Sequence, residues 1–92
     1  MINEVEISSS AKKDIKKVPK YITVKLLSWI DSVEEYGLAE TSKIKGYHDE
    51  PLRGKRKDQR SIRLSRGYRA IYIIVNDEVE FISIEEVNKH DY

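Results

Sequence analysis

Hydrophobic and polar positions alternate at the start of the chain. Val5 and Ile7 alternate with Glu4 and Glu6, a period of two that places the apolar side chains on one side. This pattern predicts a short, half-buried strand over residues 3–8.

Two consecutive helices are predicted next. Over residues 8–19, Ala11, Ile15 and Val18 recur at helical spacing, and the preceding serines suit the cap of a first turn. Pro19 interrupts this helix and suits the first turn of a second one. Gly37 supplies a stop for the second helix. The second helix has an apolar stripe, which predicts that the two helices form a hairpin packed on a sheet. The stripe consists of Ile22, Leu26, Trp29, Ile30 and Val33.

Three strand-like runs follow a polar connection over residues 38–58, in which we expect at most one short helical turn. The runs cover residues 59–65, 68–75 and 79–87, and their short links predict an antiparallel meander. In the first run, Ile62 and Leu64 face away from Ser61 and Arg63. The second run is apolar on both faces in its latter half, as a central strand would be.

The predicted fold class is therefore α+β: an N-terminal strand, a helical hairpin and a three-stranded antiparallel meander, forming one domain over residues 1–92. The helices cover one face of the sheet. The other face is left for a partner, and Arg63 points to it.

Composition excludes several classes of site. The chain of 92 residues has no cysteine, which excludes disulfides and thiolate metal sites, and its two histidines, His48 and His90, have no metal-ligand spacing. No apolar run approaches the roughly 18 residues of a membrane span, and residues 1–10 do not resemble a secretion signal. We expect a cytoplasmic protein with no membrane segment, no metal and no small-molecule cofactor.

Positive charge is concentrated in one part of a nearly neutral chain. Residues 43–72 hold ten Lys/Arg and three Asp/Glu, a net charge of +7, whereas the whole chain carries +1, which leaves −6 for the remainder. A solvated charged face is the plain interpretation of such a run. The excess spans thirty residues and falls on strands as well as a loop, which favours a polyanionic partner.

Five residues are candidates for chemistry: Glu50, Arg63, Arg69, His90 and Tyr92. Glu50 precedes Pro51, which biases it to an extended conformation, and Arg69 begins the central strand, where a guanidinium suits a phosphate. If pairing continues to the end of the chain, Asn88, His90 and Tyr92 share one face. Taken alone, Glu50 could equally be a loop acid balancing arginines, and His90 a solvated terminal residue.

Together these residues supply the parts for metal-free RNA cleavage. A carboxylate, Glu50, takes the proton from a 2′-hydroxyl, which attacks the adjacent phosphate. Arg63 and Arg69 stabilise the added charge, and His90 or Tyr92 protonates the departing 5′-oxygen. The need for a 2′-hydroxyl restricts the reaction to RNA.

The loop "PLRG", the segment "RSIRLSRGYRAIY" and the ending "KHDY", in a β-α-α-β-β-β order, resemble the RelE/ParE superfamily of type II toxins. The match covers almost the whole chain and is closest to the ribonuclease branch typified by RelE, HigB and YoeB. The resemblance implies cleavage of messenger RNA in the ribosomal A site and silencing by a cognate antitoxin.

The resemblance also implies roles for particular residues. Arg69 matches the strand arginine that holds the scissile phosphate, Arg63 a basic position on the preceding strand, and Glu50 the base of YoeB-like members. His90 and Tyr92 resemble a C-terminal His/Tyr pair, although Asp91 separates them here, and either could be the acid. The predicted RNA-binding residues are Arg53, Lys55, Arg56, Lys57, Arg60 and Ser61, the last lying where RelE has a lysine.

Two other functions fit the same pattern. One is a ParE-like toxin that inhibits DNA gyrase through protein contacts and cleaves nothing, since one fold can host both activities. The other is a basic RNA-binding module without catalysis. In the leading hypothesis the partners are an antitoxin, the ribosome and messenger RNA, and the charge map favours an acidic, amphipathic antitoxin.

Overall fold

A computed structural model describes residues 1–89 of the protein. The elements in chain order are β1 (Val5–Ile7), α1 (Ser9–Ile15), α2 (Lys20–Tyr36), α3 (Leu38–Thr41), the 3₁₀ turn η1 (Lys45–Tyr47), β2 (Glu50–Pro51), the 3₁₀ turn η2 (Gly54–Arg56), β3 (Arg60–Ser65), β4 (Tyr68–Val75) and β5 (Phe81–Lys89). Within this described part of the chain, no helix is long and apolar enough to cross a membrane.

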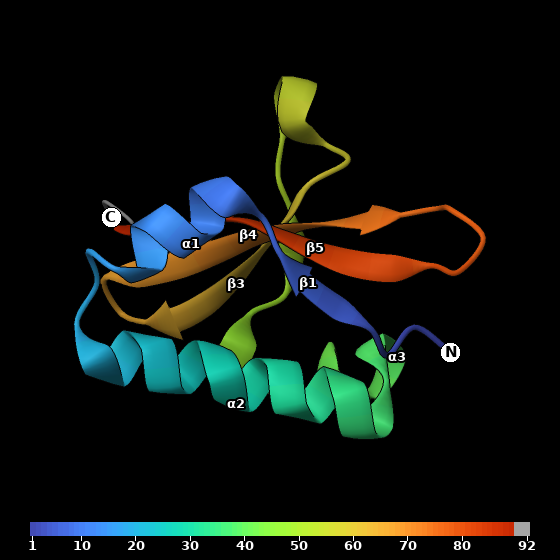
Figure 1. The fold of residues 1–92 in the computed structure, drawn as a ribbon, viewed down its shortest axis with the longest axis horizontal. Coiled ribbons are helices and arrows are strands. Elements are labelled where there is room, and N and C mark those ends of the chain that lie inside the picture. The colour runs from blue at the N-terminus through green and yellow to red at the C-terminus, as the bar shows by residue number, and fades with distance from the viewer. Residues whose placement is uncertain (90–92) are drawn as a thin grey trace.

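The strands form one mixed sheet in the order β1-β5-β4-β3-β2. The three long strands make the predicted antiparallel meander, and β1 joins its far edge parallel to β5. In Figure 1, α2 runs along one side of this sheet, and the segment that carries η2 projects away from the body. The predicted α+β class is confirmed, as is the order of an N-terminal strand, two helices and a three-stranded meander.

The core lies between α2 and one face of the sheet. All five residues of the predicted α2 stripe are buried, and they meet inward residues of β3, β4 and β5, among them Ile62, Tyr72 and Ile84. Trp29 and Tyr72 lie with ring centroids 5.1 Å apart. Trp29 is therefore a core residue, and its packing fixes the helix over the central strand.

The end of α2 is set by a close approach to the N-terminal segment. Gly37 has a φ of +87°, and a Cβ at this position would lie 2.7 Å from Met1 Cγ. Its N–H donates to Val33 O at 2.8 Å, and Leu38 N–H donates to Ile2 O at 2.8 Å. The predicted stop at Gly37 is confirmed, because a φ of this kind favours glycine.

Helix α1 is tied to β5. The Ser8 side chain caps α1 by accepting from Ala11 N–H at 3.1 Å, as the serine run predicted. At the other end, the Asp14 carboxylate accepts from the backbone N–H of Val87 at 3.0 Å. The helix thus supports β5 where the pairing with β4 is irregular.

That irregularity is a β-bulge. Tyr72 pairs with Ile84, but the adjacent Ile71 pairs with Glu86, so Glu85 is an extra residue on β5. Even-numbered residues up to Ile84 face the core, whereas after the bulge the odd-numbered Val87 does so. Glu86 and Asn88 therefore face the opposite side, which α2 does not cover.

The connection between helix and meander contains more structure than predicted. In place of one helical turn, residues 38–58 form α3, η1, the two-residue strand β2 and η2. His48 adopts a left-handed conformation, with a φ of +46°, just before β2. The expectation of a plain polar connection was wrong, because short elements held by tertiary contacts leave no periodicity in sequence.

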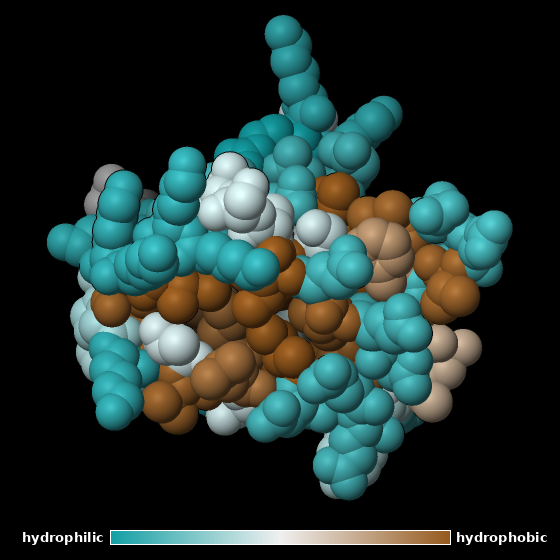
Figure 2. Space-filling model, in the orientation of Figure 1, coloured by the Kyte–Doolittle hydropathy of each residue, from teal (hydrophilic) through white to brown (hydrophobic). Residues whose placement is uncertain are grey.

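The helix-bearing side shows both apolar and charged areas. Figure 2 shows hydrophobic residues exposed between α1 and α2, and hydrophilic side chains on α1 and on the projecting segment around η2. Tyr21, Val24 and Leu27 of α2 are exposed on the side away from the core.

Leu26→Ala should lower the free energy of unfolding by about 2–5 kcal/mol, because Leu26 is 1% exposed and its loss leaves a cavity under α2. The matched control is its neighbour Leu27→Ala, which is 48% exposed and should cost less than about 1 kcal/mol. Urea unfolding followed by Trp29 fluorescence measures both variants. Equal losses would contradict the assignment of the buried stripe.

Candidate nucleic-acid interface

The face of the sheet opposite α2, here called the outer face, displays a row of polar residues across three strands. Arg63 on β3 pairs with Arg69 on β4, and Arg69 pairs with Asn88 on β5. Directly paired residues point to the same side of a sheet. Two predicted site residues, Arg63 and Arg69, are thereby brought side by side.

A second row of paired residues runs parallel to the first, two residues away along each strand. Glu50 on β2 pairs with Ser61 on β3, Ser61 pairs with Ile71, and Ile71 pairs with Glu86. Glu50 and Ser61 thus lie on the same face as the two arginines. The outer face therefore holds a carboxylate, a hydroxyl and two guanidinium groups within a few ladder positions of one another.

Arg69 and Asn88 each carry a buried polar atom that lacks a hydrogen bond. Within residues 1–89, neither the Nε donor of Arg69 nor the Oδ1 acceptor of Asn88 has a partner. Leaving such groups unpaired is costly. A polar ligand at this row would supply such partners.

The outer face also contains a network that sequence reasoning did not find. Asn88 Nδ2 donates to Glu86 Oε1 at 3.0 Å, and Arg56 donates from Nη2 to Glu86 Oε2. Arg56 Nε also donates to Gln59 Oε1 at 2.9 Å. Glu86 is two residues before Asn88 on the same strand, so strand alternation could have predicted that it shares the outer face.

Arg56 is therefore bound to the sheet rather than projecting freely. It connects the segment between β2 and β3 to β5, two strands from β3. The remaining predicted contacts of this segment, Arg53, Lys55 and Lys57, are exposed. The structure brings Arg56 to the outer face and leaves the other three on the projecting segment.

Arg60 is not brought together with the other predicted RNA-binding residues. It pairs with Tyr72, which faces the core, so its side chain is on the side opposite Arg63. Its Nε donates to Asp49 Oδ1 at 2.7 Å, and Tyr72 OH donates to Asp49 Oδ2 at 2.6 Å. The Asp49 side chain is 0% exposed. Asp49 was missed because no local pattern signals a contact with a residue 23 positions away.

These contacts shift the ionisation of both donors. Burial, reinforced by the hydrogen bond to Asp49, raises the pKa of Tyr72 well above its ordinary value. Burial acts to lower the pKa of Arg60, but the hydrogen bond and charge of Asp49 outweigh it and the pKa is raised. At neutral pH the cluster therefore holds a charged guanidinium and a neutral phenol.

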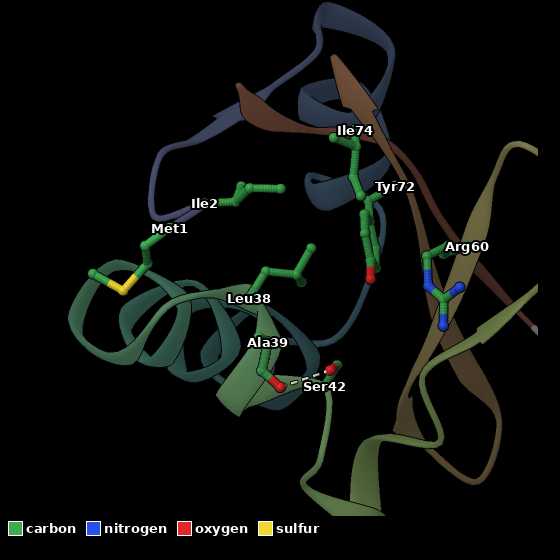
Figure 3. Close-up of a pocket in the computed structure, with 8 residues that line it drawn as sticks. All are labelled: Met1, Ile2, Leu38, Ala39, Ser42, Arg60, Tyr72 and Ile74. Atoms are coloured by element: carbon green, nitrogen blue, oxygen red, sulfur yellow. Dashed lines mark hydrogen bonds between the residues drawn. The ribbon is translucent and has the colours of Figure 1, made fainter. Parts of the chain in front are cut away.

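The cluster borders a cavity of about 420 Å³. Figure 3 shows Ile2, Leu38 and Ile74 around this space, with the Tyr72 hydroxyl and the Arg60 guanidinium beyond one side of it. The lining is mostly apolar, and Met1, Ala39 and Ser42 complete it. The cavity is on the inner side of the sheet and is separate from the outer face.

The two predicted acids, His90 and Tyr92, lie outside the described residues, and their place stays a prediction. The described strand β5 ends at Lys89, next to Asn88. Among residues 1–89, no group of three or more His, Cys, Asp or Glu side chains is placed to hold a metal ion.

Comparison with known proteins yields one family and several similar folds. Residues 5–90 match the family model described as the ParE toxin of the type II toxin–antitoxin system parDE. No curated protein matches the chain.

Three solved structures illustrate the fold similarity. A chain of the E. coli DinJ–YafQ toxin–antitoxin complex is 23% identical, with a TM-score of 0.72 over 98% of this chain and 94% of that one. The YoeB/ParE toxin from Agrobacterium tumefaciens is 14% identical, with a TM-score of 0.71 over 96% and 99%. A chain of the archaeal RelE–RelB complex from Pyrococcus horikoshii OT3 is 26% identical, with a TM-score of 0.70 over 97% and 96%.

The raised pKa of Tyr72 predicts a loss of stability at alkaline pH. Above about pH 10 the unfolded chain releases the Tyr72 proton while the folded chain retains it, so the free energy of unfolding falls as pH rises. Tyr72→Phe should reduce this decline by up to about 1.4 kcal/mol per pH unit. Urea unfolding at pH 8 to 11 measures it.

The control is Tyr36→Phe, because Tyr36 is 60% exposed and lies outside the core. A Tyr72→Phe variant that declines as steeply as the wild type would show that the folded state does not hold this proton.

Proposed function

This chain belongs to the ParE toxin family of type II toxin–antitoxin systems, and we propose that it acts as a ribosome-dependent endoribonuclease neutralised by a cognate antitoxin. One observation carries the proposal: Arg63 and Arg69 are direct cross-strand partners, with Glu50 on the same face one strand further on. A phosphate held by both guanidinium groups would lie within reach of a carboxylate base.

The proposed reaction is an attack by the 2′-hydroxyl of RNA on its own 3′-phosphate. Glu50 accepts the hydroxyl proton, the new P–O bond forms, and the bond to the departing 5′-oxygen breaks. Arg63 and Arg69 stabilise the extra negative charge on the phosphorane, and His90 or Tyr92 protonates the leaving oxygen. The products are a 2′,3′-cyclic phosphate and a 5′-hydroxyl, and no redox partner or metal ion is required for the balance.

The arrangement of Arg63 and Arg69 favours phosphate binding over a solvated charged surface with no ligand. Two like charges placed directly opposite each other in a sheet destabilise it. The cost is offset when an anion is bound between them, and charge-assisted hydrogen bonds to phosphate are stronger than neutral ones. The Nε of Arg69, which has no partner among residues 1–89, is a further donor for such an anion.

The exposed cations of the projecting segment are proposed to hold the ribosome. Arg53, Lys55 and Lys57 are exposed residues of the segment around η2, and this segment projects from the body (Figure 1). There they would meet the phosphate backbone of ribosomal RNA. Such contacts add affinity that falls with salt concentration and carry little sequence information. The proposed site of action is therefore the cytoplasm.

A cognate antitoxin is the proposed protein partner. One similar structure is a DinJ–YafQ toxin–antitoxin complex, and another is a RelE–RelB complex. The +7 region calls for an acidic partner. The exposed apolar residues Tyr21, Val24 and Leu27 along α2 suit an amphipathic one.

A second candidate function follows from the family model, which is named for ParE. In that case the chain would inhibit DNA gyrase through protein contacts, and the outer face would bind no RNA. The convergence of Glu50, Arg63 and Arg69 on one face favours cleavage, because protein–protein inhibition does not require that grouping.

Arg69→Ala should lower the rate of message cleavage on programmed ribosomes by about 100-fold or more, because it removes a principal donor to the phosphorane. The readout is the single-turnover rate on a defined message. The matched control is Arg66→Ala, an exposed arginine in the turn between β3 and β4, which should cleave within about twofold of wild type.

A gyrase supercoiling assay run with the same proteins separates the two functions. The nuclease proposal expects intact supercoiling activity and cut messages with the wild type. Inhibited supercoiling together with uncut messages would instead establish the ParE-like function.

A further inference from the structure

The candidate base, Glu50, is in a strand that has little of its own to hold it. β2 contains two residues, is an edge of the sheet and pairs only with β3. Its second residue, Pro51, has no N–H to donate, and the next bond of this segment is from Leu52 N–H to Gln59 O at 2.9 Å. A catalytic carboxylate needs a fixed position within a fraction of an ångström. Something other than β2 must therefore supply it.

The residue before Glu50 is held by hydrogen bonds to its side chain and to its backbone. Asp49 accepts from Arg60 Nε at 2.7 Å on one carboxylate oxygen and from Tyr72 OH at 2.6 Å on the other. Arg60 Nη2 also donates to the backbone oxygen of Asp49 at 3.4 Å. With the Asp49 side chain 0% exposed, water does not compete for these bonds.

Both donors belong to the sheet, and one of them belongs to the buried core. Tyr72 is 0% exposed on the central strand β4 and packs on Trp29 of α2. Arg60 begins β3 and is paired directly with Tyr72. The Asp49 carboxylate is thus held by the core itself, at a point where two strands and a helix meet.

Because Asp49 and Glu50 are adjacent in an extended segment, the position of Asp49 determines the direction of the Glu50 side chain. Successive side chains of an extended segment point to opposite faces. Asp49 is held inward by Tyr72, Pro51 pairs with the inward-facing Arg60, and Glu50 between them pairs with the outer-face residue Ser61. The left-handed turn at His48 brings the chain into this segment. Fixing Asp49 inward therefore fixes Glu50 outward.

We propose that Asp49, held by Arg60 and Tyr72, is a positioning residue that sets the place of Glu50 on the outer face. The inference rests on the proposed nuclease function and adds to it a set of residues that never touch RNA. It also gives Arg60 a role: this arginine acts from the inner side of the sheet through Asp49.

A purely structural ion pair makes a different prediction from a positioning residue. If Asp49 merely stabilises the fold, its loss affects every catalytic residue alike. If it acts through Glu50, its loss costs activity only while Glu50 is present. A double-mutant cycle between the two positions separates these cases.

The experiment measures single-turnover cleavage of a defined message on programmed ribosomes by the wild type, Asp49→Asn, Glu50→Gln and the double variant. Asn keeps the shape of the side chain but removes the charge that Arg60 pairs with. We expect Asp49→Asn to lower the maximal rate by about 10- to 100-fold, as misplacement of a catalytic group does. The toxin concentration that gives half the maximal rate should remain within about twofold.

In the Glu50→Gln background, the same Asp49→Asn change should lower the rate by less than about twofold. Asp77→Asn, an exposed acid in the turn between β4 and β5, is the matched control and should match the wild type. Multiplied losses in the double variant, or a wild-type rate for Asp49→Asn, would overturn the positioning role while leaving the nuclease proposal intact. A wild type that cuts no message would overturn the nuclease proposal, and the inference with it.

Tyr72→Phe keeps the inference testable if Asp49→Asn does not fold. It preserves the Arg60–Asp49 ion pair and removes only the bond to Asp49 Oδ2. We expect a loss of about three- to tenfold in the maximal rate, again absent in the Glu50→Gln background. Tyr36→Phe is its control. A Tyr72→Phe variant that cleaves as fast as the wild type, or that loses as much rate with Gln at position 50, counts against the proposal.

Discussion

The packing of α2 over one face of the sheet is the constraint on which the rest of the structure depends. Trp29 and the rest of the apolar stripe bury the inward residues of β3, β4 and β5. Once that face is covered, strand alternation leaves every second residue on the other face. The row of Arg63, Arg69 and Asn88 is therefore a direct consequence of where Ile62, Ala70 and Val87 are buried.

The core and the candidate site are also connected through polar contacts. Asp49 and Glu50 are adjacent in sequence but belong to opposite faces, one held by Tyr72 and the other beside Ser61. A similar connection exists on the outer face, where Arg56 joins the projecting segment to Glu86. In both places a charged side chain from an irregular segment is held by a regular strand. Contacts of this kind fix the positions of residues in irregular segments as precisely as those of the strands.

Sequence patterns predicted the parts of the fold that have strong periodicity. The α2 stripe and the alternation around Arg63 are local patterns, and the structure confirms the helix and the meander that they predicted. Arg60 shows the limit of this reasoning: its parity matches Ile62 and Leu64, yet the high local charge led us to group it with the RNA contacts. β2 and Asp49 had no local signal, because their contacts are with residues distant in sequence. The roles of Glu50, Arg63 and Arg69 remain proposals, as do those of His90 and Tyr92.

The β-bulge at Glu85 determines which face of the sheet the last residues of β5 occupy. Ile84 belongs to the core and Asn88 to the outer face, although both are even-numbered positions of one strand. If every residue of β5 were paired in turn without the bulge, uninterrupted alternation would turn Asn88 toward α2 and bring Val87 out to solvent. The bulge absorbs one residue, Glu85, and so keeps Val87 in the core and Asn88 on the outer face. The pairing of β5 with β4, and not the residue count alone, decides which surface the end of the strand serves.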